Sequence, residues 1–142
     1  MHLPGRGDFP DPDDHIVAPP TRWEIVEGRL VYQASAEHPH ATANVRIDSL
    51  LHEVVHPDYE VATDLLTRVA KTSNFASDVC VLRRGIDPET DARHLEELAV
   101  EIVDAQSLKR VSQRARLWAR RGVRRIFAVV LKKDQVREWS RE

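Results

Sequence analysis

The run Leu98-Ala-Val-Glu-Ile-Val-Asp104 is the feature from which both the expected fold and the expected site follow. A short apolar run flanked by polar residues is typical of a strand buried on both faces of a sheet. Glu101 lies inside this run, and a buried carboxylate costs free energy unless a cation, a hydrogen-bond donor or a metal ion meets it. The sequence therefore predicts a partner for Glu101.

The residues around this run predict an α/β fold. Apolar residues at three- and four-residue spacing predict helices at 40–56 and 107–121. Gly28 separates two short runs that predict a tight N-terminal hairpin. The expected strands are residues 23–27, 29–33, 59–66, 77–83, 98–104, 125–131 and 135–139.

Two connections complete the predicted order. The cluster at 71–74 predicts a turn, and the polar stretch 85–97 predicts a loop with one helical turn. The strand–helix–strand step over 98–131 implies parallel neighbours. The expected core is therefore helix, three strands, helix, strand, with a mixed sheet, a helix on each face and an N-terminal β-hairpin.

Length and composition set the expected organisation. The chain has 142 residues and a net charge of −2, which fits one domain over 21–142. The proline-rich stretch 1–20 has no apolar face and predicts an extended, flexible arm. A lone cysteine, Cys80, excludes an internal disulfide and predicts a buried core residue. No apolar run is long enough to span a bilayer or to act as a secretory signal, so we expect a cytoplasmic protein without membrane contact.

One short motif points to zinc. His52-Glu-Val-Val-His56 matches the H-E-x-x-H signature, in which two histidines four apart bind the ion and the glutamate acts as general base. A solvated helix face is the alternative, because the two histidines point away from the apolar stripe and Pro57 ends the helix. A zinc hydrolase built on His52, Glu53 and His56 therefore stays a distant hypothesis.

A second constellation joins Asp78 to Glu101. If their strands pair, the two carboxylates converge on one edge of the sheet. Two hard oxygen ligands that leave positions for water and phosphate suit Mg²⁺, which can polarise a phosphodiester. The alternative is that Asp78 caps a strand and Glu101 pairs with an arginine of the following helix.

A dense basic run follows this strand. Either it forms a solvated face with salt bridges to the acidic 87–101 segment, or it contacts phosphates without reading their sequence. Its members are Lys109, Arg110, Arg114, Arg116, Arg120, Arg121, Arg124 and Arg125.

Several motifs in order resemble a known family. Trp23-Glu-Ile-Val-Glu-Gly28 is similar to an aromatic-Glu-Leu-Ile-x-Gly opening, and Pro39-His40 is similar to the start of the first helix. Ser77-Asp78-Val79 and Val100-Glu101-Ile102 stand where the family has Pro-Asp-Val and Val-Glu-Val. Arg114, Trp118, Gly122 and Val123 follow the spacing of Lys-x-x-x-Tyr-x-x-x-Gly-Val. From about residue 23 onward the chain resembles the putative restriction endonucleases of the PD-(D/E)XK superfamily, in a bacterial branch long known as a domain of unknown function.

The resemblance implies the superfamily fold, a metal-dependent nuclease acting on DNA, one or two Mg²⁺ or Mn²⁺ ions, and a homodimer. It assigns Asp78 and Glu101 to the metal. Lys109, His40 and Glu24 are supporting candidates, with a helix cap as the alternative for His40 and a strand-surface charge for Glu24. Arg110 and Arg121 are candidate DNA contacts.

The chain departs from the expected catalytic pattern at three positions. The superfamily places a lysine two residues after the glutamate, where this chain has Val103. The branch that the chain resembles places that lysine on the next helix, where this chain has Arg114. An arginine can offset charge on a phosphate, but it stays charged and accepts no proton. Asp104 also replaces the family's serine. The alternative function is therefore a catalytically inactive relative that binds nucleic acid or a protein partner through the same cleft.

Overall fold

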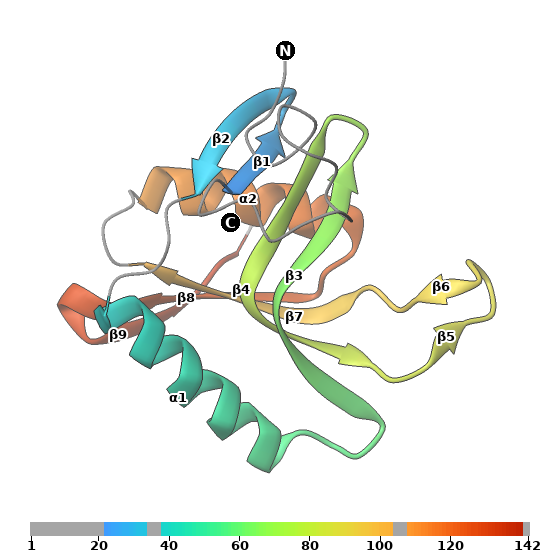
Figure 1. Ribbon diagram of the computed structural model, residues 1–142, viewed down its shortest axis with the longest axis horizontal. Coiled ribbons are helices and arrows are strands. Elements are labelled where there is room, and N and C mark those ends of the chain that lie inside the picture. The colour runs from blue at the N-terminus through green and yellow to red at the C-terminus, as the bar shows by residue number, and fades with distance from the viewer. Residues whose placement is uncertain (1–21, 34–37, 104–107, 141–142) are drawn as a thin grey trace, which may run out of the picture.

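The computed structural model of the chain describes residues 22–33, 38–103 and 108–140. The predicted arm at 1–20 lies outside the described residues, and so does Asp104. Within the described part, two α-helices pack with a seven-stranded mixed sheet and a separate two-stranded hairpin (Figure 1). The expected α/β fold, with its mixed sheet and N-terminal hairpin, is confirmed.

The sheet has the strand order β2-β1-β4-β7-β8-β9, and β3 pairs with β4. Strands β7 and β8 are parallel, as a strand–helix–strand step requires, whereas the other pairs are antiparallel. The strands are β1 (Arg22–Val26), β2 (Arg29–Gln33), β3 (Tyr59–Ala70), β4 (Ser73–Arg83), β7 (Glu96–Val103), β8 (Arg125–Val130) and β9 (Gln135–Glu138).

The helices lie on opposite sides of β7 in Figure 1. Helix α1 (His38–Val54) contacts β3, β4 and β7, and helix α2 (Leu108–Arg121) contacts β3, β7 and β8. A short 3₁₀ turn, η2 (Leu131–Lys133), joins β8 to β9. Among the described helices, none combines the length and the apolarity needed to cross a membrane.

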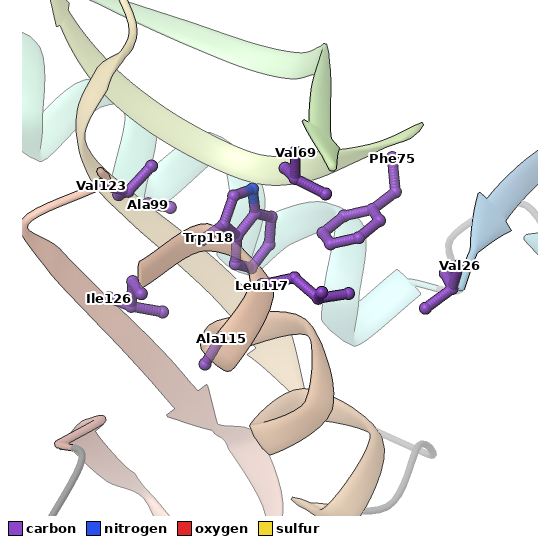
Figure 2. Packing of buried hydrophobic residues seen from close by; sticks show 9 residues of the cluster. All are labelled: Val26, Val69, Phe75, Ala99, Ala115, Leu117, Trp118, Val123 and Ile126. Carbon is purple, nitrogen blue, oxygen red and sulfur yellow. The ribbon is translucent and has the colours of Figure 1, made fainter. Parts of the chain in front are cut away.

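Helix α2 is anchored to the sheet by aromatic packing (Figure 2). Trp118 is fully buried and meets Phe75 of β4 edge to face, with ring centroids 5.0 Å apart. The helix ends where expected, because Gly122 adopts a φ of 121° and the amide of Val123 donates to the carbonyl of Trp118. This packing fixes the face of α2 that points toward the sheet.

Three expectations about element boundaries were wrong. The first of the two paired strands was expected to end at residue 66, and the second to begin at residue 77. Strands β3 and β4 instead pair up to a tight turn at Lys71–Thr72, and Thr67 of β3 is buried with its hydroxyl bonded to Glu96. The stretch 85–97 forms a hairpin of β5 (Ile86–Asp87) and β6 (Ala92–Arg93) instead of a helical turn. Asp87 supports that hairpin, since its Oδ1 accepts a hydrogen bond from the amide of Glu89.

The sheet opens at one edge of β4, and this opening positions the site. Strand β1 pairs with β4 at Asn74, and β7 pairs with it only from Val79 onward. Between these points, at residues 75–78, neither β1 nor β7 pairs with that edge of β4 in the described structure. We call residues 75–78 the sheet fork. Backbone groups at the fork require partners other than a neighbouring strand.

Candidate functional site

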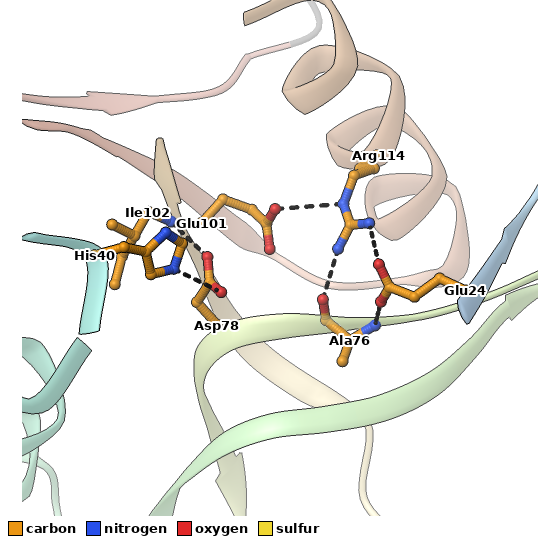
Figure 3. Close-up of polar contacts among 7 residues, drawn as sticks. All are labelled: Glu24, His40, Ala76, Asp78, Glu101, Ile102 and Arg114. Carbon is orange, nitrogen blue, oxygen red and sulfur yellow. Dashed lines mark hydrogen bonds and ion pairs between the residues drawn. The ribbon is translucent and has the colours of Figure 1, made fainter. Parts of the chain in front are cut away.

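Asp78 and Glu101 meet at the sheet fork. Val79 pairs with Val100 across β4 and β7, so Asp78 and Glu101 occupy the next positions of the two strands. The amide of Ile102 donates to Oδ2 of Asp78 over 2.7 Å, which ties Asp78 to β7. Figure 3 shows the Glu101 side chain extending between Asp78 and Arg114. The expected pairing of these two strands is therefore present.

His40 approaches Asp78 from the first turn of α1. Its Nε2 lies 3.2 Å from Oδ1 of Asp78, and both side chains are mostly buried. Both oxygens of Asp78 thus have a partner on the protein, one from α1 and one from β7. Each carboxylate oxygen accepts more than one interaction, so Asp78 keeps the capacity to bind an ion.

Arg114 reaches the fork from α2 and is buried there, with only 6% of its side chain exposed. Its Nη1 donates to Oε1 of Glu24 over 2.8 Å, and its Nη2 donates to the carbonyl of Ala76 over 2.6 Å. Its Nε lies 3.3 Å from Oε2 of Glu101 but is not aligned for a hydrogen bond, so this contact is ionic. Arg114 is thus directed at protein acceptors, and its expected phosphate contact stays a prediction.

Two aromatic rings complete the environment of Arg114. The guanidinium carbon lies 4.3 Å from the ring centroid of Phe75 and 5.4 Å from that of Trp118. This role of Phe75 and Trp118 was not predicted from the sequence. The only sequence signal was that Trp118 lies four residues after Arg114, one helical turn along the same face.

Burial sets the protonation of Glu101. Burial raises its pKa to about 8; Arg114 opposes this, while the charges of Asp78 and Glu24 add to it. Burial disfavours the charge of Arg114, but the carboxylates of Glu101 and Glu24 outweigh that effect and raise its pKa. Arg114 therefore stays charged, whereas Glu101 changes its charge near neutral pH.

One oxygen of this cluster lacks a partner. Oε1 of Glu101 is buried and has no hydrogen-bond partner in the structure. A divalent cation bound by Glu101 and Asp78 would satisfy it, and hard carboxylate oxygens suit Mg²⁺ or Mn²⁺. No group of three or more His, Cys, Asp or Glu side chains in a metal-binding arrangement occurs among the described residues. Two carboxylates alone would leave most coordination positions of such an ion to water and phosphate.

The pKa of Glu101 predicts how stability depends on pH without metal. The unfolded chain releases the Glu101 proton near its ordinary pKa of 4.5, and the folded chain releases it only near 8. The stability from keeping that proton is complete below the lower value and is lost as the pH rises through 8. In the Glu101→Gln variant, the amide at position 101 has no proton to release in this pH range. We expect the variant's free energy of unfolding, relative to the native sequence, to increase between about pH 5 and about pH 9.

Urea denaturation of both proteins at the two pH values, in the presence of EDTA, measures this difference. A difference between variant and native protein that does not change with pH would contradict the burial of an ionisable Glu101.

The other basic candidates do not join this cluster in the described contacts. Lys109 and Arg110 are exposed in the first turn of α2. Nε of Arg121 donates to the carbonyl of Arg68 over 3.2 Å. One ion pair, from Arg124 to Glu97 at 3.5 Å, matches the expectation of salt bridges to the acidic segment.

The described residues do not form the arrangement that the distant zinc hypothesis requires. Helix α1 ends at Val54, so His56 lies beyond it instead of one turn after His52 on the same helix. His52 lies 3.5 Å from Asp48, and His56 accepts a hydrogen bond from the amide of Asp58. The side chains of both histidines are more than half exposed, and neither belongs to a group of three or more metal-binding side chains among the described residues. Helix termination is the physical reason that the motif forms no site.

The sequence predicted a mixed sheet with Asp78 and Glu101 on paired strands, and the structure has both features. The chain belongs to the Uma2 family: the family model described as "Putative restriction endonuclease" matches residues 10–142. The resemblance seen in the sequence is thereby confirmed.

A solved structure shares the fold. The crystal structure of a putative nuclease belonging to DUF820 from Anabaena variabilis matches with a TM-score of 0.65 and 15% sequence identity. The match covers 82% of this chain and 75% of that chain. No curated protein matches the chain. At this identity the similarity shows the fold, and the activity is argued from the site.

Proposed function

We propose that the protein is a divalent-metal-dependent endonuclease that hydrolyses DNA phosphodiesters. The observation that carries the proposal is the unpartnered Oε1 of Glu101 beside Asp78 at the sheet fork. Family membership supports the same activity, because the family is described by nuclease function. When bound, Mg²⁺ or Mn²⁺ would supply a Lewis acid to the phosphate and the attacking water.

The chain's own residues divide the remaining tasks. Asp78 and Glu101 would hold the ion. His40 orients Asp78 through the 3.2 Å contact of its Nε2 with Oδ1. Arg114 lies against Oε2 of Glu101, whereas Oε1 of Glu101 is the oxygen without a hydrogen-bond partner. Arg114 offsets negative charge but accepts no proton from the attacking water. The exposed basic residues of α2 would supply salt-sensitive contacts to the DNA backbone.

Supercoiled plasmid incubated with the purified protein tests the proposal. We expect nicked or linear products with Mg²⁺ or Mn²⁺ and none with EDTA. Absence of any product with either metal, from protein that is folded by circular dichroism, would overturn the proposal.

A second function is favoured by one observation. Arg114 occupies the position of the family's lysine, and its Nη atoms bond Glu24 and the carbonyl of Ala76. If catalysis depends on a proton acceptor there, the protein would be an inactive relative that binds nucleic acid or a protein partner. Binding of a DNA duplex without cleavage, weakening steeply as salt increases, would identify nucleic-acid binding.

We also infer a homodimer, because each chain supplies one site and a symmetric pair of chains would place one site on each strand of a duplex. Sedimentation velocity measures the mass directly. A monomer that still cleaves both strands in one encounter would contradict this inference.

A further inference from the structure

Glu24 holds two different elements of the site at once. Its Oε1 accepts a hydrogen bond from Nη1 of Arg114 over 2.8 Å, and its Oε2 accepts one from the amide of Ala76 over 2.6 Å (Figure 3). Its side chain is 10% exposed. Glu24 comes from the N-terminal hairpin and is 90 residues from Arg114 in sequence. A carboxylate from a remote strand thus satisfies both the fork backbone and the guanidinium.

The contacts of Ala76 show how the fork is closed. Its amide donates to Glu24, and its carbonyl accepts from Nη2 of Arg114. Glu24, Arg114 and the backbone of Ala76 therefore form a closed ring of three hydrogen bonds. We call this ring the fork clamp. Because the clamp uses both Nη atoms of Arg114, only Nε is left facing Glu101.

The clamp also determines the charge beside Glu101. With Glu101 ionised, as a metal ligand would be, Glu24, Asp78 and Glu101 carry three negative charges and Arg114 carries one positive charge, so the net charge is −2. Glu24 cancels Arg114, so the remaining charge is that of Asp78 and Glu101 and equals the charge of one divalent cation in magnitude. Without Glu24 the site would carry −1 and a cation would face an uncompensated guanidinium.

We propose that Glu24 is a positioning residue of the metal site: it fixes and neutralises Arg114, so that Oε1 of Glu101 remains available to a divalent cation. This inference rests on the proposed metal-dependent function and adds a role for a residue that does not touch the ion. Groups that hydrogen-bond metal ligands typically change metal affinity by about 10–100-fold when replaced, and Glu24 acts on Arg114, which neighbours one such ligand.

The hairpin provides a matched control. Glu27 follows β1, is exposed, and also bonds α2, since its Oε2 accepts a hydrogen bond from Nε2 of Gln113 over 2.9 Å. Glu27→Gln therefore removes one negative charge and alters one hairpin–α2 contact without changing the fork clamp. It separates loss of a nearby charge from loss of the clamp.

The experiment is calorimetric titration of Mn²⁺ into the metal-free 142-residue chain, which requires no catalysis. We expect Glu24→Gln to weaken Mn²⁺ binding by about tenfold or more and Glu27→Gln to leave it unchanged within about twofold. The double variant Glu24→Gln/Arg114→Gln restores the net charge of −2 and should recover most of the lost affinity. A purely structural role for Glu24 predicts no recovery.

The outcomes separate this inference from the proposed function. Native protein that binds Mn²⁺ with the same affinity as Glu24→Gln overturns the role of Glu24 and leaves the metal site standing. Native protein that binds no Mn²⁺ overturns both. Should the double variant unfold in circular dichroism, the comparison of the two single variants still decides the role of Glu24.

Discussion

Glu101→Gln is expected to reduce metal-dependent plasmid nicking by at least about a thousandfold, equivalent to about 4 kcal/mol of transition-state stabilisation. The amide is nearly isosteric but carries no charge, so it removes one of the two anionic ligands from the fork. Asp78→Asn should have a comparable effect, because its carboxylate is the other proposed ligand. Initial rates of conversion from supercoiled to nicked plasmid measure both losses.

Glu97→Gln is the matched control for this prediction. Glu97 lies on the same strand and pairs with the exposed Arg124 instead of the fork. The Glu97→Gln protein should therefore nick plasmid at the rate of the native protein. Equal nicking by native protein, Glu101→Gln and Asp78→Asn would assign the activity to a contaminant and remove the evidence for this site.

Arg114→Met should destabilise the fold by about 3–5 kcal/mol, a large share of the total stability of a domain of this size. The substitution keeps apolar contact with Phe75 and Trp118 but leaves Glu24 and Glu101 buried without their cation. It also leaves the carbonyl of Ala76 without its Nη2 donor. Urea denaturation with an unchanged m-value gives the free energy of unfolding.

Arg116→Met is the corresponding control, since Arg116 is exposed on the same helix. Surface substitutions of this kind usually change stability by less than about 0.5 kcal/mol. A loss for Arg114→Met as small as that for Arg116→Met would show that the buried ion pairs contribute little, and would contradict the clamp as a structural element.

Much of the site was predictable because alternation and apolar runs determine strand identity. The run around Glu101 and the strand containing Asp78 were both expected, and antiparallel pairing then places the two acids at adjacent positions. The burial of Arg114 was not predictable in the same way. A basic helix looks solvated in sequence, and the four-residue spacing of Arg114 and Trp118 does not by itself reveal that Phe75 and Trp118 lie against the guanidinium group.

Glu24 shows a second limit. Local sequence suggests that Glu24 is a charge on the surface of its strand. Its side chain is instead nearly buried against Ala76 and Arg114, which lie 52 and 90 positions away in the sequence. Long-range contacts of this kind depend on tertiary structure. The hairpin at 85–97 and the end of α1 at Val54 have a different reason, because periodicity does not show where a short polar segment pairs or where a helix ends.

The most direct measurement is the anomalous difference density of Mn²⁺-soaked crystals. We expect a peak at the sheet fork, within about 2.0–2.6 Å of a carboxylate oxygen of Asp78 and of Oε1 of Glu101. A fork without density while Mn²⁺ occupies another position, such as the histidines near the end of α1, would contradict it.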